Sequence, residues 1–133
     1  PLTTSLLQKY GDSWTHALAI NDLYFDFMGP SLAAAGLSPE QGPKAGSAGD
    51  GSEAAFQRIR SNGYQTITVA EPLNLQGWQL VDELNRAIQG EACSGYVTSP
   101  ALVTAEGLAK LGDSNAFDPD IPYRKSYADI WGK

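Results

Sequence analysis

The feature that most constrains this chain is a pattern that occurs three times: an apolar run, a polar junction and a segment with helical periodicity. The apolar runs are residues 14–20, 43–49 and 64–70, and the second is the weakest because its residues are small. Runs of this length bounded by Gly, Pro, Asn and Asp are typical of strands. Repeated strand-helix units predict an α/β domain with parallel strands joined by right-handed crossovers.

Capping residues predict where the first two helices begin and end. The first should begin after Asn21-Asp22, because Asn and Asp are natural N-caps, and should end or kink at Gly29-Pro30. A further short helical stretch over 31–37 should close at Gly36. The second helix is expected over 53–63, with Asp50 and Glu53 approximating a capping box.

The third helix is predicted by an apolar stripe that recurs at helical spacing and ends at Gly90. The stripe consists of Trp78, Val81, Leu84 and Ile88. Such a stripe is typical of core packing.

Beyond Gly90 the pattern changes. Residues 95–104 hold one more strand, interrupted or started by Pro100, and residues 105–119 are interpreted as a surface loop. A last helix should begin near Pro122 and dock through an aromatic side.

Composition narrows the classes of function. The net charge of -6 and the absence of a basic run argue against a nucleic-acid partner. His16 is the only histidine, so a multi-histidine metal site cannot be built within the chain. Because we expect His16 to be a strand residue rather than a catalyst, no Ser-His-Asp triad is predicted. Cys93 is the only cysteine and is interpreted as a partly buried thiol. No cofactor or metal is predicted.

Side-chain oxygens follow each predicted strand. In sheets of parallel strands, ligands bind outside the carboxyl ends of the strands. Asn21, Asp50 and Glu71 stand at the three junctions and are the candidate ligand-binding residues. Asn21 and Asp50 have an alternative interpretation as helix N-caps. Glu71 is a poor cap and precedes Pro72, so it favours a functional cleft.

The segments ALAINDLYFDF, AGSAGDGSEAAFQRIRSNGYQTITVAEPLNLQGWQLVDELNRAIQGE and SGYVTSPALVT together resemble a known family. They are similar to the carboxyl-terminal half of a periplasmic sugar-binding protein of the type I, ribose-binding-like class, the substrate-binding component of ABC sugar transporters. The resemblance covers roughly residues 13 to 104. It implies a three-layer parallel-sheet lobe, present here as a fragment, and a periplasmic location reached by a signal peptide that is not in this chain.

The resemblance also implies residue roles. Asn21 matches the family asparagine that bonds sugar hydroxyls, and Asp50 matches the aspartate of the Gly-x-Asp-Gly turn, which accepts from two neighbouring hydroxyls. Glu71 stands where the family often has glutamine, so the pattern of hydroxyls recognised would differ. Glu71-Pro72 would be a hinge. The implied ligand is a monosaccharide or polyol, bound with hinge closure and without bond breaking.

By the same resemblance, residues 1–72 are part of the carboxyl-terminal lobe. Residues 73–96 are a hinge and a helix that belongs with the amino-terminal lobe, and 97–133 are the last strand and a docked tail. The implied partners are an inner-membrane ABC permease and either the missing amino-terminal portion of the same protein or a second copy of the fragment. Alone, the chain should bind sugar weakly or not at all.

Two other functions remain open at this point. One is the effector-binding domain of a LacI-type transcriptional regulator, which shares the fold class. The other is a small α/β enzyme that uses Asp50 or Glu71 as a general acid or base.

Overall fold

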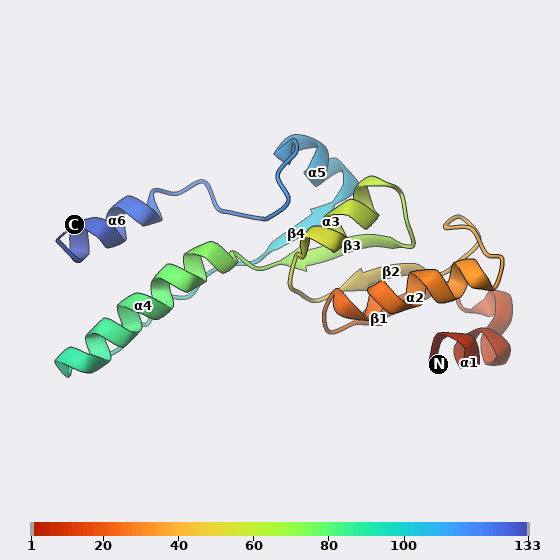
Figure 1. Cartoon of the computed structure of the whole chain (residues 1–133), viewed down its shortest axis with the longest axis horizontal. Helices are drawn as coiled ribbons and strands as arrows, with labels where there is room; N and C mark the ends of the chain where they lie inside the picture. The colour runs from red at the N-terminus through yellow and green to blue at the C-terminus, as the bar shows by residue number, and fades with distance from the viewer. Residues whose placement is uncertain (1, 133) are drawn as a thin grey trace. The chain divides into compact units, whose positions relative to one another are not determined.

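The structure is a computed structural model that describes residues 2–132 (Figure 1). The chain divides into two compact units, which are described separately. The first comprises residues 2–70 and 101–116, and the second comprises residues 71–100 and 117–132. No helix among the described residues is long and apolar enough to cross a membrane.

The first unit is a mixed α/β fold around a four-stranded sheet. Its strands lie in the order β1-β2-β3-β4. They are β1 (His16–Ala19), β2 (Lys44–Ser47), β3 (Gln65–Ala70) and β4 (Ala101–Thr104). The three strands of the repeated units are parallel, as the sequence predicted, and His16 lies in β1 as expected.

The fourth strand departs from an all-parallel sheet, because β4 runs antiparallel to β3. The chain leaves β3 at its carboxyl end and returns to the same end after residues 71–100, with Ala70 paired to Ala101. A strand that re-enters at the end where its neighbour left must run the opposite way.

Helices α2 (Leu23–Ala34) and α3 (Glu53–Arg60) cover one face of this sheet. Phe25, Met28 and Leu32 of α2 form a core cluster with Ala45 of β2. Arg58 of α3 donates from Nη2 to the carbonyl oxygen of Asp22, where α2 begins, at 3.2 Å. Its Nε donates to Oε1 of the buried Gln65 at 2.8 Å, so both helices lie on the same side.

The opposite face of the sheet carries apolar side chains that no helix of the first unit covers. Gly46 pairs with Leu18 on one side and with Ile67 on the other, and a Cβ at Gly46 would touch both side chains. Leu18 is 88% exposed and Leu102 of β4 is 66% exposed. The three layers expected from the resemblance are therefore two layers within this unit.

Two expectations about local structure are wrong, and a third is confirmed in part. Helix α2 does not end at Gly29-Pro30, since it continues to Ala34 with Pro30 inside it, and the alternative of a kink there stays a prediction. The predicted helical stretch after Pro30 and its close at Gly36, with φ +81°, are confirmed. The predicted loop after residue 104 begins with helix α5 (Ala105–Leu111), because the Thr104 hydroxyl accepts from the Gly107 N–H at 3.2 Å and caps it. Cys93 is exposed rather than partly buried.

The first unit also contains two elements for which the sequence analysis made no prediction. Helix α1 (Leu2–Tyr10) and the 3-10 turn η1 (Gly11–Ser13) precede β1. Leu7 of α1 and Trp14 pack against the core cluster of α2.

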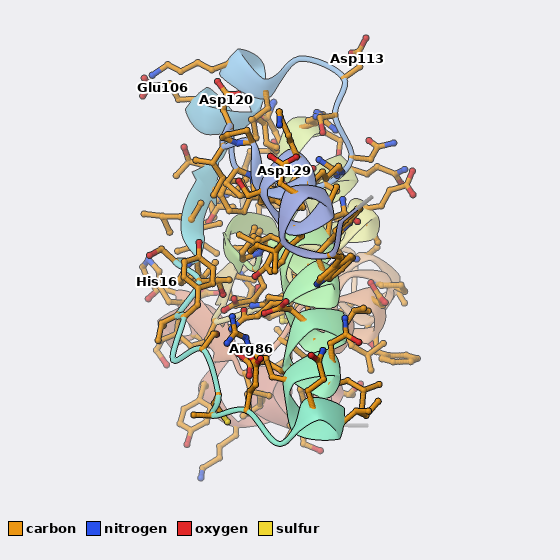
Figure 2. The ribbon with its side chains drawn as sticks, turned by 90° about the vertical axis from the view of Figure 1, so that its left-hand side faces the viewer. His16, Arg86, Glu106, Asp113, Asp120 and Asp129 are labelled. Atoms are coloured by element: carbon orange, nitrogen blue, oxygen red, sulfur yellow. The ribbon has the colours of Figure 1, made fainter. Side chains whose placement is uncertain are left out.

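The second unit is built from α4 (Leu73–Gln89) and α6 (Tyr123–Ile130). Trp78 of α4 stacks on Trp131 with ring centroids 5.3 Å apart, so the predicted docking of the tail is confirmed within this unit. Asp82 accepts from the Trp131 indole N–H at 2.9 Å and from Nε of Arg86, labelled in Figure 2, also at 2.9 Å. Helix α4 ends at Gly90 with φ +73°, as expected.

Only one residue of the apolar stripe predicted on α4 packs against another helix, and the others are exposed. Trp78 packs against α6, whereas Val81, Leu84 and Ile88 are exposed, together with Leu80. Since successive helical residues are about 100° apart, Leu84 and Ile88 project from the side of α4 opposite to Asp82. The prediction of core packing is therefore wrong for most of the stripe within the described residues.

Candidate functional site

Asn21 lies just after β1, at the carboxyl end of that strand. Its Oδ1 accepts from the N–H of Leu23, the first residue of α2, at 3.2 Å, although the N-cap residue of α2 is Asp22, whose side chain makes no capping bond. The amide nitrogen of Asn21 has no hydrogen-bond partner among the described residues. Asn21 is half-buried and can therefore offer that N–H group to a ligand.

Asp50 lies in the turn that connects β2 to α3, and its side chain is exposed. Its carboxylate makes no hydrogen bond or ion pair with a described residue. The capping box predicted for Asp50 and Glu53 is wrong, because Ser52 caps α3 by accepting from the Ala55 N–H at 3.2 Å. The Asp50 carboxylate is therefore free of the structural role that competed with ligand binding.

The structure brings the Asn21 and Asp50 junctions together. The Ala48 N–H donates to the carbonyl oxygen of Ala19 at 3.0 Å, so the chain after β2 runs beside the chain after β1. A Cβ at Gly49 would lie 3.8 Å from the Ile20 carbonyl oxygen. Both candidates therefore stand at one edge of the sheet, as parallel strands require.

The buried acid beside this edge is Asp22, the second residue of the Asn21-Asp22 junction, which the sequence analysis named as a possible cap. It is 1% exposed and accepts from four donors. Its Oδ1 accepts from the Ser47 hydroxyl and from Nε2 of Gln65 at 2.7 Å. Its Oδ2 accepts from the N–H groups of Gly51 and Ser52, each at 2.9 Å. Asp22 therefore joins the sheet to the turn that carries Asp50.

The electrostatics of Asp22 follow from these contacts. Burial by itself raises the pKa of the Asp22 carboxyl, but hydrogen bonds from Ser47, Ser52, Gln65 and Thr68 outweigh burial and hold that pKa below its ordinary value. The carboxyl is therefore ionised at neutral pH. Every buried side-chain polar atom among the described residues has a partner, so the network is complete.

No sequence signal pointed to this role for Asp22. Gln65 reaches it only because the register between β2 and β3 shifts after Ala45, which turns Gln65 to the same face as Thr68. A glycine with positive φ at 51 also lets the turn fold back onto β3. Neither the shift nor the fold-back is visible as a pattern of residue types.

Glu71 belongs to the second unit, so the structure brings only Asn21 and Asp50 together within one unit. The Glu71 carboxylate is half-buried and accepts from Nε2 of Gln76 at 2.8 Å. The same Nε2 lies 3.1 Å from the Thr98 hydroxyl. Pro72 is the N-cap residue of α4 and is buried, and its role as a hinge stays a prediction.

No group of three or more His, Cys, Asp or Glu residues among those described is arranged to hold a metal ion. Neither a known protein-family profile nor a curated protein sequence matches the chain.

Proposed function

We propose that this chain is part of the solute-binding component of an ABC sugar importer and binds a monosaccharide or polyol through hydroxyl hydrogen bonds. The observation that carries the proposal is that the junctions of Asn21 and Asp50 lie side by side at the carboxyl edge of β1 and β2, with the Asp50 carboxylate exposed and without a partner among the described residues. A sugar presents several hydroxyl donors, and a fixed carboxylate accepts from two of them.

The resemblance adds what these contacts alone do not carry: the type I fold of the lobe, a third acceptor at Glu71, hinge closure at Pro72 and a periplasmic location. In this proposal closure around the ligand is the signal read by the permease, and no bond is broken. No contact in the site distinguishes a sugar receptor from the effector-binding domain of a LacI-type regulator. The enzyme alternative is not favoured at Asp50, whose carboxylate has no partner among the described residues that would tune it as a general acid or base.

The ligand-binding proposal is tested by titrating the ¹⁵N-labelled chain with pentoses, hexoses and cyclic polyols while following amide resonances. We expect weak binding, in the millimolar range, with shifts concentrated at Asn21, Asp50 and their neighbours, because by the resemblance one lobe supplies only half of the family's site. Asp50→Asn should weaken the binding by roughly tenfold, the loss expected for a charged hydrogen bond. Asp113→Asn is the matched control, since Asp113 is an exposed carboxylate on another segment (Figure 2).

Two results would overturn the proposal. One is the absence of any saccharide-dependent shift at these amides. The other is an equal loss of affinity for Asp50→Asn and Asp113→Asn. Micromolar binding by the chain alone would support sugar recognition but contradict the incompleteness of the site.

The proposed partner is the remaining portion of the same protein or, without it, a second copy of the chain. Three apolar surfaces favour such a partner. The first is the uncovered sheet face with Leu18 and Leu102, and the second is the exposed stripe of α4. The third is a groove of about 470 Å³ between α1, β1 and α2, and none of the residues that line it is charged. Exposed apolar patches of this kind are typical of interaction sites.

Sedimentation of the purified chain tests this partner. We expect association that increases with concentration. Leu84→Glu should reduce it, because a charge would then lie in the exposed stripe of α4. Asn85→Glu adds the same charge at an exposed neighbouring position and should leave association unchanged. A chain that stays monomeric at high concentration, or equal effects of both variants, would contradict the proposal.

A further inference from the structure

We propose that Asp22 is a positioning residue that sets the place of the Asp50 carboxylate in the ligand site. The inference rests on the proposed sugar-binding function and adds to it a residue that does not touch the ligand. Asp50 makes no contact that would fix its own turn, since its side chain has no partner among the described residues. The position of the turn must therefore come from its backbone.

Asp22 holds that backbone on the side that follows Asp50. Oδ2 of Asp22 accepts from the N–H groups of Gly51 and Ser52, the two residues directly after Asp50, at 2.9 Å each. Two charge-assisted bonds to consecutive amides restrict both the location and the orientation of the peptide groups between them. Asp50 is bonded directly to Gly51, so its Cα follows the same restraint.

Asp22 is itself fixed to the sheet. Its Oδ1 accepts from Ser47 at the end of β2 and from Gln65 at the start of β3. Gln65 in turn is oriented by Arg58, whose Nε donates to Oε1 of Gln65 at 2.8 Å. The Asp22 carboxylate therefore fixes the turn relative to β2, β3 and α3.

The restraint matters for binding because hydroxyl recognition depends on geometry. A functional group must be held within about 0.5 Å of its productive position to keep its full contribution. Without the Asp22 carboxylate, the amides of Gly51 and Ser52 lose their hydrogen-bond acceptor, and the turn can move so that these amides donate to water instead. Asp50 would remain charged and exposed but would no longer be held in register with Asn21.

The experiment compares Asp22→Ala with Asp22→Asn in the full ¹⁵N-labelled chain. The first measurement is hydrogen exchange at the Gly51 and Ser52 amides, normalised to the Ala45 amide in β2. We expect at least tenfold faster normalised exchange in Asp22→Ala. Asp22→Asn keeps one oxygen that can face the two amides but loses the charge, so its normalised exchange should be faster than in the unmodified chain and slower than in Asp22→Ala.

The second measurement is the Kd for the saccharide that binds the unmodified chain best. It should rise at least tenfold in Asp22→Ala and less in Asp22→Asn. Ile59→Val, which trims a buried side chain of α3, controls for loss of stability and should change neither readout. If Asp22→Ala does not fold, the normalised exchange at Gly51 and Ser52 is compared between Asp22→Asn and Ser47→Ala. Ser47→Ala removes one donor to Oδ1 of Asp22 but leaves both of its bonds to the amides of the turn.

The outcomes separate this inference from the proposed function. Unchanged normalised exchange at Gly51 and Ser52 in Asp22→Ala overturns the positioning role, whatever the sugar affinity. In the fallback comparison, equal exchange in Asp22→Asn and Ser47→Ala does the same. Faster exchange with an unchanged Kd overturns its importance for binding. If no saccharide binds any variant, the proposed function fails, and the exchange measurement alone decides whether Asp22 fixes the turn.

Discussion

Replacing Gly51 by alanine tests the geometry of the turn that carries Asp50. Gly51 has φ +77°, a region that L-residues with a Cβ rarely adopt. A Cβ at this position would lie 2.3 Å from the Cβ and 2.7 Å from the Cα of Ala70 in β3. The second contact is with backbone, so no side-chain rotation relieves it. Gly51→Ala should therefore displace either the turn or the end of β3.

The magnitude follows from two separate costs. The left-handed conformation costs a residue with a Cβ about 1–2 kcal/mol. Overpacking in a well-packed site costs about 1–3 kcal/mol more. The expected loss of stability is then about 2–5 kcal/mol, a large fraction of the roughly 5–15 kcal/mol that stabilises a typical domain.

Urea unfolding followed by far-ultraviolet circular dichroism measures this loss. With a slope of about 2 kcal/mol per molar urea, the midpoint should fall by about 1–2.5 M. Gly36→Ala is the matched control, because Gly36 has φ +81° and nothing lies within 4 Å of the Cβ that alanine would add. Its midpoint should fall by only about 0.5–1 M, the conformational cost alone.

The comparison of the two variants isolates the contact with Ala70. Equal midpoints for Gly51→Ala and Gly36→Ala would refute the close approach of the turn to β3. A Gly51→Ala chain as stable as the unmodified one would refute the positive φ as well. The difference between the variants, rather than either value, carries the conclusion.

Three further predictions follow from the network and from the second unit. Because the pKa of Asp22 is lower in the folded than in the unfolded chain, its contribution to stability is complete above about pH 4 and is lost as the pH falls toward the folded pKa. The difference in unfolding free energy between the unmodified chain and Asp22→Asn should therefore shrink below about pH 4, and a constant difference would contradict this. Trp131→Phe keeps a ring against α4 but removes the N–H donor to Asp82, so the pKa of the Asp82 carboxyl should rise in a ¹³C NMR titration, with Tyr127→Phe as a control that should not raise it. Cys93 is exposed and should react fully with a thiol reagent in the folded chain, and protection until urea is added would show that it is buried.

The sequence predicted the elements whose signals are local. The β-branched run before Glu71 gave β3, and the glycines at 36 and 90 marked helix ends because a positive φ there suits a residue without a Cβ. The junction residues Asn21 and Asp50 could be placed at one sheet edge because parallel strands deliver their carboxyl ends together.

Other features could not be predicted from the sequence, because tertiary packing decided between conflicting local signals. Pro30 usually ends a helix, yet α2 continues past it, since Leu32 on the far side of the proline is fully buried in the core. Helix α5 was interpreted as part of a loop because the residues that follow it are polar. Thr104 nevertheless caps this helix, and its Leu108 is buried. The stripe on α4 had the right period, but periodicity cannot say whether a partner surface is present.

The sequence by itself determined the strand-helix repeat and the polar residues at the ends of β1, β2 and β3. Only the tertiary structure decided which junction acid is committed to holding the fold. Asp22 and Asp50 are the same amino acid at equivalent junctions, yet Asp22 accepts four hydrogen bonds in the interior, whereas the exposed Asp50 carboxylate accepts none from the described residues. The reason is physical: burial and hydrogen-bond partners come from segments about thirty or forty residues away, at Gly51, Ser52 and Gln65, and no local pattern encodes them.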